Sequence, residues 1–150
     1  MKTTKRVIGA LELCDLPDLA ISGLNVRVDT GATTSSLHVD NLEEFEKDDE
    51  LWVSFDIHPD IHNVDRIVRR QAKVLGKKRV KSSTATREKR YVISTPIVMA
   101  GEEWVIQITL TDRSEMTYLM LFGREAMNGR FIVDPEFDYV LTEKPDAVEA

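Results

Sequence analysis

The chain has 150 residues, of which 42% are hydrophobic and 31% charged, and its formal net charge is −6. A chain of this size can bury roughly two-thirds of its unfolded surface, and the spread of apolar and aromatic residues along most of its length argues against wholesale disorder. We therefore predict one domain over residues 1–150, with a core at about 6–142 and a frayed tail after it.

The location of the protein is predicted from what the sequence lacks. No apolar run approaches the ~20 residues of a membrane helix, and Glu12, Asp15 and Pro17 interrupt the apolar stretch near the amino terminus, which argues against an export signal. The single cysteine, Cys14, cannot form an internal disulfide. These features predict a protein of the reducing cytoplasm with no membrane partner.

Charge is distributed unevenly along the chain. Residues 66–90 include eleven basic residues and one acidic residue, a net charge of +10, whereas the remainder carries −16. A concentrated basic segment attracts anionic ligands over about a Debye length, ~8 Å at physiological salt. An acidic ligand is therefore a candidate partner.

Short segments rich in Val, Ile, Leu and Thr, bounded by Gly, Pro, Asp and Asn, predict a mainly β fold. The expected strands cover residues 6–13, 24–28, 51–57, 67–75, 90–99, 103–111, 118–122 and 131–133. Within residues 104–110 large apolar side chains alternate, so one face should pack inward while Gln107 and Thr109 face a wetter environment.

Two short segments are predicted to be helical: residues 42–47, which are acidic and amphipathic, and residues 124–128, which follow Gly123. Ala100-Gly101 predicts a hairpin turn between two apolar runs. Residues 82–86 form a polar patch between two basic, strand-like arms, as at the tip of an exposed hairpin.

The segment Val28-Asp29-Thr30-Gly31-Ala32 carries the candidate chemistry. A strand delivers an aspartate into a turn, and the following glycine lets backbone approach closely where a side chain would obstruct it. This pattern is typical of an aspartic peptidase loop. The same tripeptide also occurs at ordinary strand-ending turns, where the aspartate caps backbone amides.

A second motif supports the peptidase interpretation. The apolar residues 119–122 run directly into Gly123-Arg124, and retropepsins have a similar apolar-apolar-Gly-Arg segment that holds the aspartate turn rigid. Together with residues 29–38, 109–113 and 131–135, these motifs resemble the retropepsin-like aspartic peptidase family historically labelled ATP-dependent zinc protease, over residues 7–141. The resemblance implies a closed β-barrel of the acid protease type with one short C-terminal helix.

The resemblance also implies the site residues, with Asp29 as the catalytic carboxylate and Thr30, Gly31 and Ala32 as its support. An aspartic peptidase needs two carboxylates that share one proton, one to activate the attacking water and one to protonate the scissile carbonyl. The chain contains one Asp-Thr-Gly sequence. The second carboxylate is therefore expected from a second copy of the chain in a symmetric homodimer.

The family label mentions ATP and zinc, but the sequence supports neither. It has no Gly-x-x-x-x-Gly-Lys-Ser/Thr loop and no His-Glu-x-x-His motif. The histidines are His38, His58 and His62; the last two are four residues apart, but Pro59 argues against one helical face. We therefore expect no cofactor and no metal.

The hairpin around residues 82–86 occupies the place where a retropepsin carries the flap that closes over substrate. Its polar and basic residues, with Arg113, are candidate substrate contacts, and they favour an acidic or glutamate-rich peptide: Ser82, Ser83, Thr84, Arg87 and Arg90. The alternative is a solvated edge whose lysines prevent strand pairing with neighbours, with Arg113 in a structural ion pair. The tip lacks the glycine that the family pattern leads us to expect, which reduces turn freedom.

Three functions remain open from the sequence. The first is an aspartic endopeptidase that acts as a homodimer. The second is a catalytically silent module with the same fold that binds acidic peptides, in which case Asp29→Asn would leave function intact. Nucleic-acid binding ranks last, because the chain is acidic overall and lacks a basic face interleaved with aromatic residues.

Overall fold

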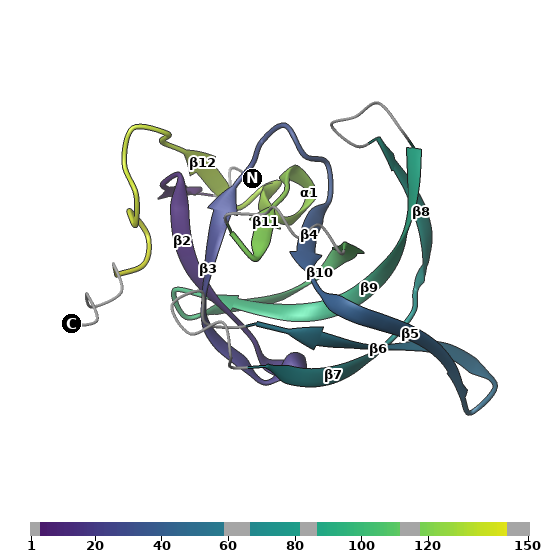
Figure 1. Cartoon of the computed structure of the whole chain (residues 1–150). Helices are drawn as coiled ribbons and strands as arrows, with labels where there is room; N and C mark the ends of the chain where they lie inside the picture. The colour runs from purple at the N-terminus through teal and green to yellow at the C-terminus, as the bar shows by residue number, and fades with distance from the viewer. Residues whose placement is uncertain (1–3, 59–66, 82–86, 112–117, 144–150) are drawn as a thin grey trace.

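A computed structural model describes residues 4–58, 67–81, 87–111 and 118–143, with only the backbone of 78–81 and 87–89 (Figure 1). Strands dominate the described part, as the sequence predicts. The elements are β1 (Arg6–Ile8), β2 (Leu11–Leu16), the 3-10 turn η1 (Pro17–Leu19), β3 (Ile21–Val28), β4 (Ser35–His38), β5 (Asp40–Lys47), β6 (Glu50–Ile57), β7 (Val68–Lys73), β8 (Gly76–Lys81), β9 (Arg87–Met99), β10 (Glu102–Thr111), β11 (Met120–Phe122), α1 (Arg124–Met127) and β12 (Phe131–Val133).

Six strands close into a barrel in the order β10-β4-β11-β3-β2-β9, and the pairing of β9 with β10 completes the ring. The short β11 is paired on both sides, parallel to β3 and antiparallel to β4. Figure 1 shows β11 and the neighbouring α1 between β3 and β4 at one end of the barrel. The expected closed barrel with one short C-terminal helix is confirmed.

The hairpin of β9 and β10 forms the longest pairing in the barrel. Its turn is Ala100-Gly101, as predicted, and both residues have positive φ angles of 50° and 82°, which suit a two-residue hairpin loop. In β10, Gln107 is exposed as predicted, whereas Thr109 is buried. The prediction for Thr109 was wrong because β4 lies alongside β10, where the Thr109 hydroxyl donates to the Ser35 carbonyl oxygen at 3.3 Å.

A separate three-stranded sheet of β5, β6 and β7 corrects the predicted helix at residues 42–47. That segment is part of β5, because Asp48 and Asp49 adopt positive φ angles of 53° and 62° and turn the chain tightly back into β6. The apolar Phe45 then stands opposite Trp52, with ring centroids 6.3 Å apart. Cross-strand pairing therefore overrides the helical spacing of the apolar residues.

The first predicted strand is divided at Gly9-Ala10. β1 leaves the barrel to pair in parallel with β12, while β2 continues to Leu16, beyond the predicted end. A Cβ atom at Gly9 would lie 2.4 Å from the carbonyl oxygen of Phe137, so only glycine allows the C-terminal segment to cross here. β4, whose four residues are all buried, was not predicted from the sequence.

The basic arms predicted around residues 82–86 are β8 and β9, which pair antiparallel as far as Lys81 and Arg87. The tip between them lies outside the described residues. β8 extends the barrel sheet at the β9 side.

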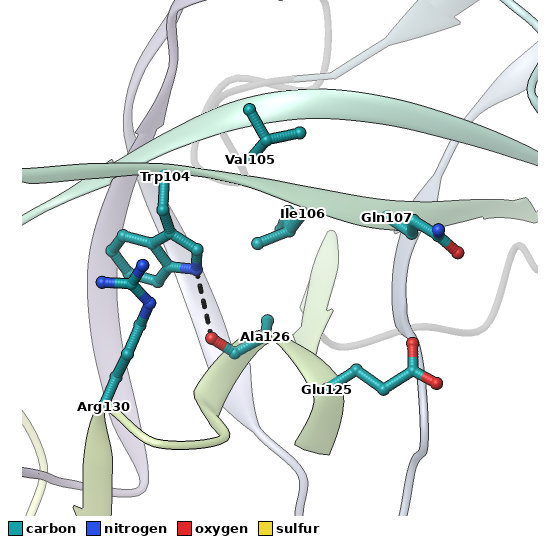
Figure 2. Close-up of a pocket in the computed structure, with 7 residues that line it drawn as sticks. All are labelled: Trp104, Val105, Ile106, Gln107, Glu125, Ala126 and Arg130. Carbon is teal, nitrogen blue, oxygen red and sulfur yellow. Dashed lines mark hydrogen bonds between the residues drawn. The ribbon is translucent and has the colours of Figure 1, made fainter.

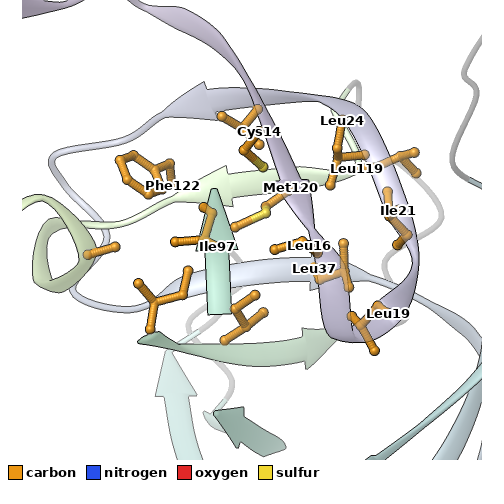
Figure 3. Packing of buried hydrophobic residues seen from close by; sticks show 14 of the residues in the cluster. Cys14, Leu16, Leu19, Ile21, Leu24, Leu37, Ile97, Leu119, Met120 and Phe122 are labelled. Carbon is orange, nitrogen blue, oxygen red and sulfur yellow. The ribbon is translucent and has the colours of Figure 1, made fainter. Parts of the chain in front are cut away.

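One apolar core fills the barrel and continues to the inner face of β6. Figure 3 shows side chains from β2, β3, β4, β9 and β11 packed against one another. Cys14 lies in this core, and burial raises the pKa of its thiol above the ordinary 9.0. No helix in the described ranges is both long and apolar enough to cross a membrane.

Candidate active site

The predicted aspartate turn, residues 29–34, begins where β3 ends and is called the Asp29 turn below. The Asp29 amide donates to the Phe122 carbonyl oxygen at 2.9 Å, and the Ala32 amide closes the turn on the Asp29 carbonyl oxygen at 3.2 Å. The Gly31 amide donates to Oδ1 of Asp29 at 3.0 Å. The Asp29 side chain is thereby oriented by the backbone, while Thr30 and Gly31 are exposed.

Gly123 allows β11 and α1 to pack directly against the Asp29 turn. A Cβ atom at this position would lie 2.5 Å from the carbonyl carbon of Thr34 and 2.7 Å from the nitrogen of Ser35. The Gly123 amide donates to Oγ of the buried Ser35 at 2.9 Å. The glycine in the second motif is therefore required by close backbone approach.

Arg124 joins the two motifs. Its guanidinium donates to the Thr30 carbonyl oxygen at 2.8 Å and to Oγ1 of Thr33 at 3.2 Å. Its amide donates to the Ala32 carbonyl oxygen at 2.8 Å, and the Glu125 amide donates to the Thr33 carbonyl oxygen at 2.9 Å. Four hydrogen bonds from two adjacent residues thus fix the far side of the Asp29 turn.

This geometry presents one carboxylate in a rigid, partly exposed turn. Within the described residues, the Asp29 carboxylate accepts one hydrogen bond, from Gly31. Its remaining lone pairs are available to a water molecule or to a protonated second carboxyl group. The turn is therefore suited to general acid–base chemistry on a bound substrate.

The structure describes only some of the candidate substrate residues. Ser82, Ser83, Thr84 and Arg113 lie outside the described residues. Arg87 begins β9, and Arg90, further along β9, is 7% exposed. A side chain as buried as that of Arg90 is poorly placed to meet a substrate from solvent.

Part of the basic segment is neutralised within the chain. Arg69 lies 3.0 Å from an oxygen of Asp56, Lys73 lies 3.0 Å from Glu50, and Lys77 lies 3.4 Å from Glu44. Hydrogen bonds from Asn41 and Arg69 hold the pKa of the Asp56 carboxyl below its ordinary value. The acidic β5–β6 hairpin and the basic strands therefore compensate each other locally, a pairing that the charge count of the sequence did not predict.

A buried carboxylate, Glu12, is a structural site that the sequence analysis missed. It accepts backbone hydrogen bonds from Gly9, Val140, Leu141 and Thr142, and a further one of 2.6 Å from the Thr142 hydroxyl. Glu12 is 0% exposed. The alternation of β2 gave a signal, because it places Glu12 on the same inward face as Cys14 and Leu16.

Two of the three histidines share one carboxylate. Nε2 of His58 lies 2.8 Å from Asp40, and Nε2 of His38 lies 3.5 Å from the other oxygen of Asp40. His62 lies outside the described residues. Among the residues with described positions, no group of three or more His, Cys, Asp or Glu side chains is arranged to hold a metal ion.

A closed barrel in which an aspartate turn is hydrogen-bonded to β11 and to the Gly123-Arg124 segment defines a retropepsin-like protein. The chain belongs to the RimB-like family, described as retropepsin-like aspartic endopeptidase RimB, whose family model matches residues 7–144. The expected family is confirmed.

Two similar proteins named as ligases are longer than this chain. The chain is 42% identical over 146 residues to a Shewanella pealeana protein named "Probable alpha-L-glutamate ligase", which aligns 97% of this chain with 32% of that protein. A Desulfotalea psychrophila protein of the same name is 43% identical over 141 residues, 93% of this chain and 30% of that protein. The chain therefore spans about a third of the length of these relatives.

A solved structure has the same fold. The crystal structure of a Legionella pneumophila protein of unknown function superimposes with a TM-score of 0.77 at 25% identity, covering 93% of this chain and 100% of that one.

Proposed function

We propose that the protein is an aspartic endopeptidase whose catalytic carboxylate is Asp29. The observation that carries the proposal is the Asp29 turn, in which a partly exposed carboxylate accepts a hydrogen bond from the Gly31 amide while Phe122 and Arg124 hold the backbone of the turn. Such preorganisation is what acid–base catalysis requires, because the carboxylate does not have to be reoriented during the reaction.

The proposed mechanism needs a second copy of the chain. In a twofold homodimer the Asp29 turns of both copies face each other, and the two carboxylates share one proton because like charges at short distance oppose double ionisation. The ionised carboxylate takes a proton from the attacking water, and the protonated one donates to the scissile carbonyl oxygen. Thr30, Gly31 and Ala32 supply the backbone that supports this pair.

The proposed substrate is an acidic or glutamate-rich peptide. Two observations support it: the net charge of +10 in residues 66–90, and the name of the relatives, which refers to the ligation of glutamate. Arg69, Lys73 and Lys77 are already paired with acidic side chains. The proposed substrate contacts are those named from the sequence: Ser82, Ser83, Thr84, Arg87 and Arg113.

A second candidate is a peptide-binding module with the same fold and no catalysis. The match to about a third of longer proteins named as ligases favours it, because such a module would hold an acidic chain for another active site. In both candidates the peptide binds at the Asp29 turn, and they differ in whether the peptide bond is cut.

The decisive experiment is incubation of a glutamate-rich peptide library with wild-type protein, Asp29→Asn and Asp18→Asn, read by mass spectrometry. Asp18 is an exposed aspartate outside the Asp29 turn and serves as the matched control. We expect cleavage by wild type and Asp18→Asn, with and without EDTA, and none by Asp29→Asn. Cleavage that survives Asp29→Asn would contradict the mechanism, and peptide binding without cleavage in every variant would favour the binding module.

The dimer is tested separately: sedimentation velocity over a range of protein concentrations gives the dimer fraction, which is compared with the specific activity at each concentration. We expect the specific activity to rise with the dimer fraction, because each active site needs both copies. Full activity in a purely monomeric preparation would exclude the shared site.

A further inference from the structure

A pocket lies between α1 and the barrel strand β10. It has a volume of about 200 Å³ and is formed by β10, α1 and the residue before β12 (Figure 2). The lining residues are Trp104, Val105, Ile106, Gln107, Glu125, Ala126 and Arg130. A dry cavity of ~150 Å³ can hold a molecule the size of benzene, so this pocket has room for a small organic ligand.

One end of the pocket is cationic. The Arg130 guanidinium lies over the Trp104 ring, 4.5 Å from its centroid, and Nε1 of Trp104 donates to the Ala126 carbonyl oxygen at 3.1 Å. The stacking fixes the guanidinium plane but leaves its N–H groups for an acceptor. None of the residues placed in the structure gives this guanidinium an ion pair or a hydrogen bond.

The other end is anionic and amide-bearing. In Figure 2, the Glu125 carboxylate and the Gln107 amide lie near each other, and Ala126 and Ile106 separate them from Arg130. Both Glu125 and Gln107 are exposed, and within the described ranges neither side chain forms a hydrogen bond or an ion pair. The two ends therefore offer an anion site and a cation site with an apolar floor between them.

We propose that this pocket binds a short free peptide, of dipeptide size, as a zwitterion. Its terminal carboxylate accepts hydrogen bonds from Arg130, and its terminal ammonium group donates to Glu125 and Gln107. One cation and one anion in the pocket match one carboxylate and one ammonium group, so uncharged side chains suit the site better than acidic ones. The proposal does not depend on the proposed function, because it requires neither the Asp29 carboxylate nor cleavage of a peptide.

Glu125 connects the pocket with the Asp29 turn. Glu125 presents its side chain to the pocket while its amide donates to the Thr33 carbonyl oxygen at 2.9 Å. Ligand contact with the Glu125 carboxylate therefore restrains the same residue that braces the turn. Binding should slow hydrogen exchange of the Glu125 amide.

The test uses the two tryptophans of the chain as reporters. The ¹⁵N-labelled protein is titrated with L-alanyl-L-alanine to about 20 mM, and the indole N–H signals are followed by NMR, since the expected dissociation constant is on the order of 1 mM. The Trp104 signal should shift and saturate, while that of Trp52, outside the pocket, should not. N-acetyl-alanyl-alanine and alanyl-alanine amide, which each lack one terminal charge, should bind roughly tenfold more weakly.

Two variants assign the ends of the ligand. Arg130→Gln should bind the free peptide and its amide equally weakly, and Glu125→Gln should bind the free peptide and its N-acetyl form equally weakly. The matched control is Lys47→Gln, because Lys47 lies over the Trp52 ring at 4.6 Å in the same kind of cation–π contact. Lys47→Gln should bind as wild type does.

The proposal would be overturned by any of three results: no saturable shift at Trp104, equal shifts at both tryptophans, or unchanged affinity in both pocket variants. The dispersion of the amide signals in the NMR spectrum of each variant serves as the control for folding. Because Glu125 is exposed, Glu125→Gln keeps the test valid if Arg130→Gln fails to fold.

Discussion

The Arg124 guanidinium lies 2.8 Å from the carbonyl oxygen of Thr30, although 94 residues separate them in the chain. Through this bond, the segment after β11 holds the backbone next to Asp29, the candidate catalytic carboxylate. Arg124 is therefore a positioning residue, since it holds the Asp29 turn and does not contact Asp29 itself.

We expect Arg124→Lys to lower kcat by roughly tenfold or more while changing KM little, because lysine cannot reproduce the two-pronged contact with Thr30 and Thr33. Steady-state kinetics on a cleaved peptide measure kcat and KM separately. Arg27→Lys, at an exposed position of β3, is the control and should match wild type. A pure loss of stability with normal kcat per folded molecule would assign Arg124 a merely structural role.

Gly123→Ala should destabilise the fold by about 3 kcal/mol or more, because the added Cβ would overlap backbone atoms of Thr34 and Ser35 that cannot move as a side chain could. Urea unfolding followed by circular dichroism measures the loss. Gly76→Ala is the matched control, since a Cβ there meets nothing within 4 Å, and its change should stay within about 1 kcal/mol. Equal effects at both positions would contradict the close packing of β11.

Glu12→Gln should cost about 3 kcal/mol of unfolding free energy, because an amide nitrogen would replace one of two oxygens that both accept hydrogen bonds from the 140–142 segment. The loss should also increase proteolysis near the C-terminal end of the chain, which mass spectrometry locates. Glu136→Gln, at an exposed position, should have neither effect.

Glu12 also predicts the acid sensitivity of the fold. Burial is the largest influence and raises the pKa of Glu12, but the hydrogen bonds from Gly9, Thr142 and Leu141 outweigh it and hold the pKa below 4.5. The folded state then binds fewer protons than the unfolded state, so this contribution is complete above about pH 4.5 and declines as the pH falls through the lowered folded pKa. In urea unfolding from pH 7 to 3, the free energy of unfolding should fall less steeply with acid in Glu12→Gln than in wild type. Identical slopes would refute this contribution of Glu12.

Cys14 should resist alkylation in the native protein, because it is 2% exposed and burial raises the pKa of its thiol. Labelling with a chromogenic disulfide at increasing urea should follow the unfolding curve recorded by circular dichroism. Fast labelling in the absence of urea would show that the core around β2 opens locally.

The mainly β content and the Asp29 turn could be predicted because their signals are local, whereas the closed barrel was implied by the family resemblance. An aspartate at the end of an apolar strand, a following glycine and a later Gly-Arg pair each specify a backbone geometry within a few residues. The Ala100-Gly101 turn was predictable for the same reason, since its positive φ angles are a property of the two residues.

Burial and pairing of single residues could not be predicted in this way. Residues 42–47 have apolar spacing that fits a helix, and only their pairing with β6 makes them a strand. Thr109 is polar in sequence, and only the neighbouring β4 buries it. In each case the partner comes from another part of the chain, which periodicity does not specify.

By itself, then, the sequence determined the mainly β content, the Asp29 turn and the basic character of residues 66–90, and its resemblance to a known family implied the closed barrel. Tertiary structure alone decided which of those charges are neutralised, that Arg124 braces the turn, and that Glu12 holds residues 140–142 across 130 positions of sequence. The physical reason is that turn geometry is set by covalent neighbours, whereas hydrogen bonds and ion pairs depend on which distant segments the closed barrel brings within 3 to 4 Å.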